Sequence, residues 1–84
     1  MSQSQKKIYG RVAEAMLYFA RIIFEQESFE LPFTRQEFAD LIGVSRESAT
    51  RVLLKFQSEG LLSIHGRMIK IENPVMLDRI SRNG

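Results

Sequence analysis

The polar residues with the most informative spacing lie in a short segment near the middle of the chain. If this segment is helical, with roughly 100° per residue, four polar residues fall on one side of it: Arg46, Glu47, Thr50 and Arg51. Its apolar residues fall within one arc of about 100° on the other side: Ala49, Val52, Leu53 and Phe56. Guanidinium forks and a carboxylate can hydrogen-bond to base edges in the major groove of DNA. On this pattern alone, however, an ordinary solvated helix face is the commoner explanation.

A shorter helix is predicted just before this segment. Thr34 begins the sequence TRQE, in which the threonine hydroxyl accepts from a backbone N–H three residues on and Glu37 reaches back. We expect a helix over 35–42, and Gly43 suits the left-handed conformation that ends it. The apolar residues expected on its inner face are Phe38, Ala39, Leu41 and Ile42.

The second helix follows after a tight turn. Ser45 is placed to cap it, and Gly60 terminates it after about Glu59. The order helix, glycine, apolar residue, cap and helix predicts a helix-turn-helix over 34–60. Leu54 falls on the polar side of the second helix, and it could contact a thymine methyl group or pack against the segment that follows.

That following segment predicts a β-hairpin, or wing, over 61–72. Leu62 and Ile64 alternate in step with Ile69 and Ile71, and His65-Gly66 is the expected two-residue turn. A last helix over 74–82 begins after an asparagine cap, with proline at its first position. The apolar residues that support this helix are Val75, Leu77 and Ile80.

Before the helix-turn-helix, apolar residues recur every three or four positions and predict a leading helix over 6–27. A second apolar set lies on another side of this helix: Ile8, Ala15, Phe19 and Ile22. Either the helix is buried on both sides within this domain, or one stripe faces another domain or subunit. Phe29, Leu31 and Phe33 alternate with polar residues and Pro32, which suits a short edge strand.

Composition narrows the class of protein. The chain has 84 residues, so a single domain over 1–84 with one thin core is expected. It has no cysteine, and its one histidine has no partners for a metal or catalytic site, so we expect no enzyme activity, no metal and no cofactor. No segment approaches a membrane span, and we expect a cytoplasmic protein with no membrane partner. The net charge is only +2, so nucleic-acid affinity would depend on where the cations lie.

The sequence TRQEFADLIGVSRESATRVLLKFQSEGLL followed by SIHGRMIKI resembles the DNA-binding domain of the cyclic-AMP receptor protein and fumarate-nitrate reductase regulator (Crp/Fnr) family of bacterial transcription regulators. The preceding GRVAEAMLYFA resembles the helix that joins that domain to the family's sensor half. The resemblance implies a winged helix-turn-helix, mainly α with a small β-hairpin, that binds double-stranded DNA. We expect the family's sensor domain to be absent from this chain.

The resemblance also implies roles for individual residues. Those expected to contact bases are Arg46, Glu47, Thr50 and Arg51. Those expected to contact the DNA backbone are Thr34, Arg35, Gln36, Ser45, Ser48, His65, Gly66 and Arg67. The implied partners are double-stranded DNA, a second subunit in the full-length regulator, and RNA polymerase. As an isolated domain the chain is expected to dimerise weakly or not at all.

Two questions stay open at the level of sequence. The absent sensor domain favours the reading in which the second apolar stripe of the leading helix once faced that domain or a second subunit. The modest net charge and the apolar leading helix also suit an alternative function, a winged-helix protein-interaction module that binds no DNA.

Overall fold

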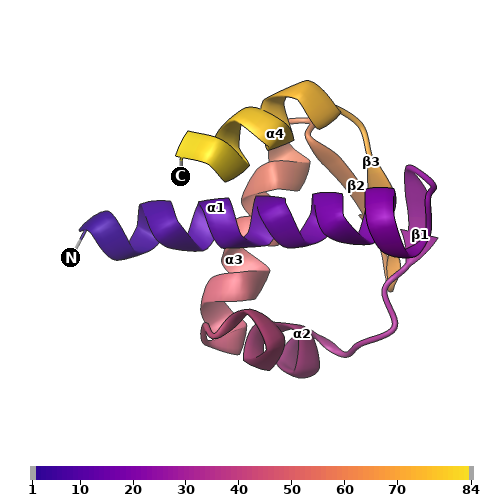
Figure 1. Ribbon diagram of the computed structural model, residues 1–84. Helices are drawn as coiled ribbons and strands as arrows, with labels where there is room; N and C mark the ends of the chain where they lie inside the picture. The colour runs from indigo at the N-terminus through magenta and orange to yellow at the C-terminus, as the bar shows by residue number, and fades with distance from the viewer. Residues whose placement is uncertain (1, 84) are drawn as a thin grey trace.

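The computed structural model describes residues 2–83, with side chains from Lys7 onward (Figure 1). Its elements are α1 (Ser2–Tyr18), the π-helical turn η1 (Phe19–Ile23), β1 (Ser28–Glu30), α2 (Arg35–Ile42), α3 (Arg46–Ser58), β2 (Leu62–His65), β3 (Met68–Ile71) and α4 (Pro74–Asn83). The fold is a winged helix-turn-helix, as predicted.

The core is built around α1, which runs through the middle of the molecule. Figure 1 shows α4 on one side of α1 and α2 on the other, with α3 crossing α1 between them. The residues of α1 that are buried include Val12, Ala13, Met16 and Leu17. Gly10 is also buried, and the helix continues through it.

The end of α1 differs from the prediction. The helix predicted over 6–27 begins at Ser2 and changes at Phe19 into a single π turn, in which the N–H of Phe24 donates to the carbonyl of Phe19 at 2.9 Å. A π turn holds about one residue more than an α turn, so the apolar residues after it are displaced around the axis. Phe24 therefore reaches the core, where it stacks on Phe29 with ring centroids 5.3 Å apart, whereas Ile23 is exposed.

The apolar surface of α1 that lacks a partner is consequently smaller than expected. Phe19 packs against the rings of Phe29 and Phe33, while Ile8 and Ala15 lie against the core. Both sides of the helix are thus largely covered within the described part of the chain. The large apolar residues of α1 and η1 that are exposed are Tyr18, Ile22 and Ile23.

The helix-turn-helix agrees with the prediction except at one residue. Gly43 adopts the left-handed conformation that ends α2, with φ of 78°, and the four predicted apolar residues of α3 are buried: Ala49, Val52, Leu53 and Phe56. Phe38 and Ala39 of α2 are also buried. Leu41, which was predicted to face inward, is 59% exposed because it lies about 100° around the helix axis from the centre of the buried face.

The sheet has three strands in the order β1-β3-β2, so the predicted hairpin gains a third strand. The short strand predicted near Phe29 is indeed an edge strand, and it pairs with β3 through Phe29 opposite Ile69. Pro32 lies outside it. Within the hairpin, Leu62 lies opposite Ile71 and His65 lies opposite Met68.

The turn of the hairpin is shifted by one residue from the predicted His65-Gly66. Because His65 is paired with Met68, the two turn residues are Gly66 and Arg67. Gly66 has φ of 63°, whereas Arg67 is not among the residues with positive φ. This is the pattern of a type II′ turn, which takes glycine at its first central position.

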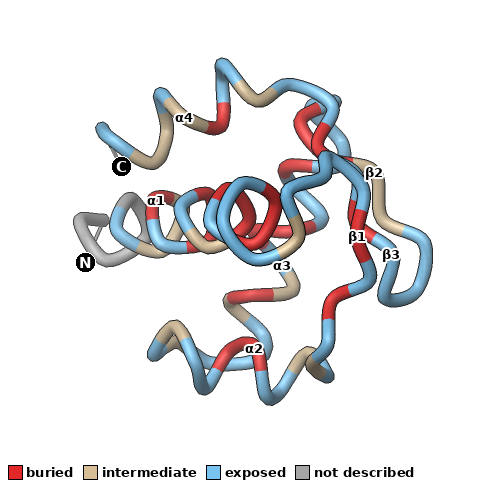
Figure 2. Tube along the Cα trace, turned by 45° about the vertical axis from the view of Figure 1, so that its right-hand side comes forward, coloured by how far each residue is buried: buried red, intermediate tan, exposed pale blue. Residues whose placement is uncertain are grey.

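The last helix closes the core from the side opposite α2. Asn73 caps it by accepting from the N–H of Met76 at 3.1 Å, and Leu77 is buried against the core. Figure 2 shows α4 as mostly exposed or intermediate, with a buried stretch within it. Val75, which was predicted to support this helix, is exposed on its outer side. Asp78 forms an ion pair with Arg82 within α4 and another, at 3.4 Å, with Arg21 of η1, and the second pair ties α4 to the end of the leading helix.

Candidate nucleic-acid interface

The start of α3 is fixed by two serines. The Oγ of Ser45 accepts from the backbone N–H of Ser48 at 3.1 Å and donates to the Oγ of Ser48 at 2.9 Å. Such a cap satisfies one of the N–H groups that the first turn of a helix leaves unpaired. The two hydroxyls predicted to contact the DNA backbone therefore lie at the N-terminus of α3, where the helix dipole favours negative charge.

The predicted base-contacting residues share one side of α3, and we call this group the α3 polar face: Arg46, Glu47, Thr50 and Arg51. Arg46, Glu47 and Arg51 are exposed and Thr50 is half-buried. None of the four makes a side-chain hydrogen bond or ion pair with another described residue of the chain, 7–83. Since the opposite side of α3 lies in the core, the charged groups of the α3 polar face point toward solvent.

A second group of predicted contact residues comes from the start of α2 and the tip of the wing, and we call it the α2–wing edge. Its members are Thr34, Arg35, Gln36, His65, Gly66 and Arg67. They come from distant parts of the sequence, but a hydrogen bond joins them: the Nη2 of Arg35 donates to the carbonyl of Gly66 at 3.0 Å. The three wing residues are exposed.

Other polar groups of the α2–wing edge are also engaged within the chain, although the side chains of His65 and Arg67 have no hydrogen-bond partner among residues 7–83. The Oγ1 of Thr34 accepts from the N–H of Glu37 at 3.1 Å, and the Oε1 of Glu37 accepts from the N–H of Thr34 at 2.9 Å, which completes the predicted capping box. Gln36 donates to Asp40 at 2.9 Å. The wing tip has a second anchor, because the N–H of Leu31 donates to the carbonyl of Arg67 at 2.8 Å.

Two basic residues near the helix-turn-helix were not identified from the sequence. Lys7 and Arg11 of α1 line a groove of about 240 Å³ together with Gly43, Val44 and Ser45 of the turn. The Nη1 of Arg11 donates to the carbonyl of Ile42 at 3.4 Å. Nothing in the local pattern could have placed them here, because the packing of α1 across α2 and α3 brings them to the turn.

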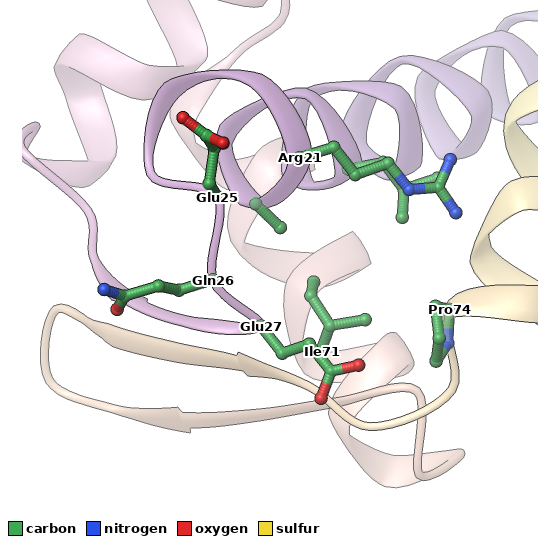
Figure 3. Close-up of a pocket in the computed structure, with 8 residues that line it drawn as sticks. Arg21, Glu25, Gln26, Glu27, Ile71 and Pro74 are labelled. Carbon is green, nitrogen blue, oxygen red and sulfur yellow. The ribbon is translucent and has the colours of Figure 1, made fainter.

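A separate groove lies at the other end of α1 and contains none of the predicted contact residues (Figure 3). It has a volume of about 470 Å³ and is lined by side chains of both charges, including Arg21, Glu25 and Glu27. Figure 3 shows the two carboxylates directed apart and the guanidinium of Arg21 directed toward α4. These groups do not converge on one point, and no cluster of metal-ligating side chains occurs among the residues that the structure describes.

A helix that could cross a membrane would need to be both long and strongly apolar. No helix in the described range, 2–83, meets both conditions.

Comparison with known proteins identifies relatives along nearly the whole chain. The fumarate and nitrate reduction regulatory protein of Yersinia pestis is 34% identical over 85 residues, which cover 95% of this chain and 34% of that protein. The cAMP-activated global transcriptional regulator CRP of Pasteurella multocida is 30% identical over 67 residues, which cover 76% of this chain and 32% of that protein. The chain thus spans about a third of the length of these curated relatives, whose names are those of transcription regulators and not of enzymes.

A solved structure of a protein with a related name has a similar fold. The catabolite activator protein of Thermus thermophilus is similar with a TM-score of 0.82 and 28% sequence identity, over 95% of this chain and 36% of that one. The sequence of this chain was also compared with models of protein families. The family model of the Crp-like helix-turn-helix domain matches residues 10–80. By this match, which includes α2, α3 and the wing, the chain belongs to the Crp-like helix-turn-helix family.

Proposed function

We propose that the chain binds double-stranded DNA in a sequence-specific manner, as the C-terminal domain of a Crp/Fnr-type transcription regulator. One observation carries this proposal: the α3 polar face presents two guanidinium groups and a carboxylate without partners among the described residues, on a helix whose other side is locked into the core. A rigid helix with free, forked donors suits the major groove, where each base pair has its own pattern of donors and acceptors.

The proposed contacts divide into two kinds. Arg46 and Arg51 would donate to the two acceptors of guanine, Glu47 would accept from the amino group of cytosine, and Thr50 would contact a neighbouring base edge. The α2–wing edge, together with Ser45 and Ser48, would contact phosphates and so fix the orientation of α3. We propose no cofactor for this activity in this chain, because these side chains would make the contacts with DNA themselves.

The proposed partners follow from the geometry of such regulators. In the full-length protein, a homodimer would place the second α3 about one turn of DNA away, at about 34–36 Å. RNA polymerase is the further partner that we propose for a transcription regulator, which would act in the bacterial cytoplasm. The isolated chain would make few phosphate contacts as a monomer, so we expect a dissociation constant near the non-specific range of about 10⁻⁴–10⁻⁶ M.

The test is selection of bound sequences from a random duplex pool, followed by anisotropy titration of the selected duplex and of a scrambled duplex near 50 mM salt. We expect the selected duplex to bind more tightly than the scrambled one. Arg51→Ala should reduce the difference in affinity between the selected and the scrambled duplex. Arg79→Ala is the matched control, because it removes the same charge from an exposed site on α4, across α1 from α2.

The proposal would be wrong if the chain bound no duplex under these conditions. It would also be wrong if Arg51→Ala and Arg79→Ala weakened binding to both duplexes by the same factor. In that case, the affinity would reflect net charge and not recognition by α3.

A further inference from the structure

Leu54 is an exposed apolar residue in the middle of a polar surface. It is 57% exposed, whereas its neighbour Leu53 is buried in the core. Seven residues separate it from Glu47, which at roughly 100° per residue places the two side chains within about 20° of each other around the α3 axis. Leu54 therefore continues the α3 polar face by one further turn, beyond Thr50 and Arg51.

The sequence left two explanations for Leu54, a contact with a thymine methyl group or packing against the wing. The structure rules out the packing. Packing against the wing would bury Leu54, but Leu54 belongs neither to the buried cluster nor to the apolar residues packed against it within the described chain. The side chain thus points to solvent from the same side of α3 as the charged groups proposed to read bases.

We propose that Leu54 is a specificity-determining residue that contacts the C5-methyl group of a thymine in the major groove. This inference rests on the proposed function. The thymine methyl is the one methyl group that base pairs present in that groove, and the polar positions there carry donors or acceptors that leucine would leave unpaired. Leu54 lies about 4.5 Å beyond Arg51 along the helix axis, a distance comparable to the spacing of roughly one base pair.

The experiment removes the methyl group from the DNA and the side chain from the protein. In the duplex selected by the wild-type chain, each thymine is replaced in turn by deoxyuridine, which lacks only the C5-methyl group. The dissociation constants of the 84-residue chain and of Leu54→Ala are then measured by anisotropy at about 50 mM salt. Alanine suits an exposed helical position, so we expect the variant to fold, and circular dichroism checks this.

For the wild-type chain, we expect deoxyuridine at one thymine position to raise the dissociation constant roughly fourfold, the factor expected for one buried methyl group. In Leu54→Ala this sensitivity should disappear, while sensitivity to changes at the base pairs read by Arg51 remains. Leu41→Ala is the matched control, because Leu41 is 59% exposed and lines a groove beside α1 instead of the α3 polar face. It should keep the wild-type deoxyuridine profile.

Two failures can be told apart. If the wild-type chain and Leu54→Ala bind the selected duplex with the same deoxyuridine profile, Leu54 reads no methyl group, and the inference is overturned while the proposed function stands. If neither binds any duplex, the proposed function itself fails and the inference fails with it.

Discussion

The α3 polar face and the α2–wing edge both belong to the helix-turn-helix and its wing, but their side chains are held differently. On the α3 polar face, the charged groups have no partner among the described side chains. On the α2–wing edge, Arg35 is bonded to the wing tip and Thr34 caps α2. A group that is already bonded gives up that bond when it changes partner, so the second region is suited to setting position and the first to recognising a ligand.

The largest expected effect is on the core that both regions share. Leu53→Ala removes a buried side chain from α3 and should lower the free energy of unfolding by about 2–5 kcal/mol. Leu54→Ala, one residue further on, should change it by no more than about 0.5 kcal/mol, because that side chain is exposed. Urea denaturation followed by circular dichroism measures both. Similar values for the two variants would contradict the division of α3 into a core side and a free side.

The next largest effect is a loss of discrimination between base pairs, as distinct from a uniform loss of affinity for all duplexes. Arg51→Ala and Glu47→Ala should each remove about 1–3 kcal/mol of discrimination at one base pair, and the two base pairs should differ. The measurement is a set of anisotropy titrations in which each base pair of the selected duplex is changed in turn. If either variant loses affinity equally for all these duplexes, its side chain does not read a base.

Thr34 and Thr50 allow the same substitution to be made in each region, one in the α2–wing edge and the other in the α3 polar face. Thr34→Ala removes the cap of α2 and should cost about 1 kcal/mol of stability, with no change in base preference. Thr50→Ala should do the reverse, leaving stability within about 0.5 kcal/mol and altering the preferred base at one position. Thermal unfolding and duplex selection report the two quantities separately. A change of base preference in Thr34→Ala would show that the α2–wing edge does more than set position.

The smallest expected effect concerns Arg35. Arg35→Ala should weaken binding to selected and scrambled duplexes by a similar factor and lower the slope of log K against log salt by about one. Because Arg35 also holds the carbonyl of Gly66, its effect should not be additive with that of Arg67→Ala. The double variant should therefore lose less than the sum of the single losses, by about 0.5 kcal/mol or more. Strict additivity would mean that Arg35 contacts DNA without acting through the wing.

The features that could be predicted from the sequence depend on residues close together in the chain. The capping box at Thr34, the left-handed Gly43 and the cap at Ser45 each involve contacts within about four residues, and each is present. The buried side of α3 follows from helical periodicity in the same way. Helical periodicity also located the α3 polar face, which lies opposite the buried side. The contacts of this face with DNA stay predictions.

The features that could not be predicted depend on contacts between distant segments. Arg35 and Gly66 are 31 residues apart, and only the folded sheet brings the wing tip to α2. The exposure of Ile23 results from the π turn, which packing of Phe24 on Phe29 stabilises and which periodicity does not reveal. The turn residues Gly66 and Arg67 differ from the predicted pair because the strand register, and not the glycine alone, decides which residues pair.

The third strand gives the wing a property that a lone hairpin would lack. Two-stranded hairpins are marginally stable in water. Here β3 is bonded on both edges, and the tip is fixed by Leu31 and Arg35. The conformational entropy of the wing is therefore lost when the chain folds, before any ligand arrives. A ligand that contacts the tip meets a preorganised surface, and its affinity is not reduced by the cost of ordering that segment.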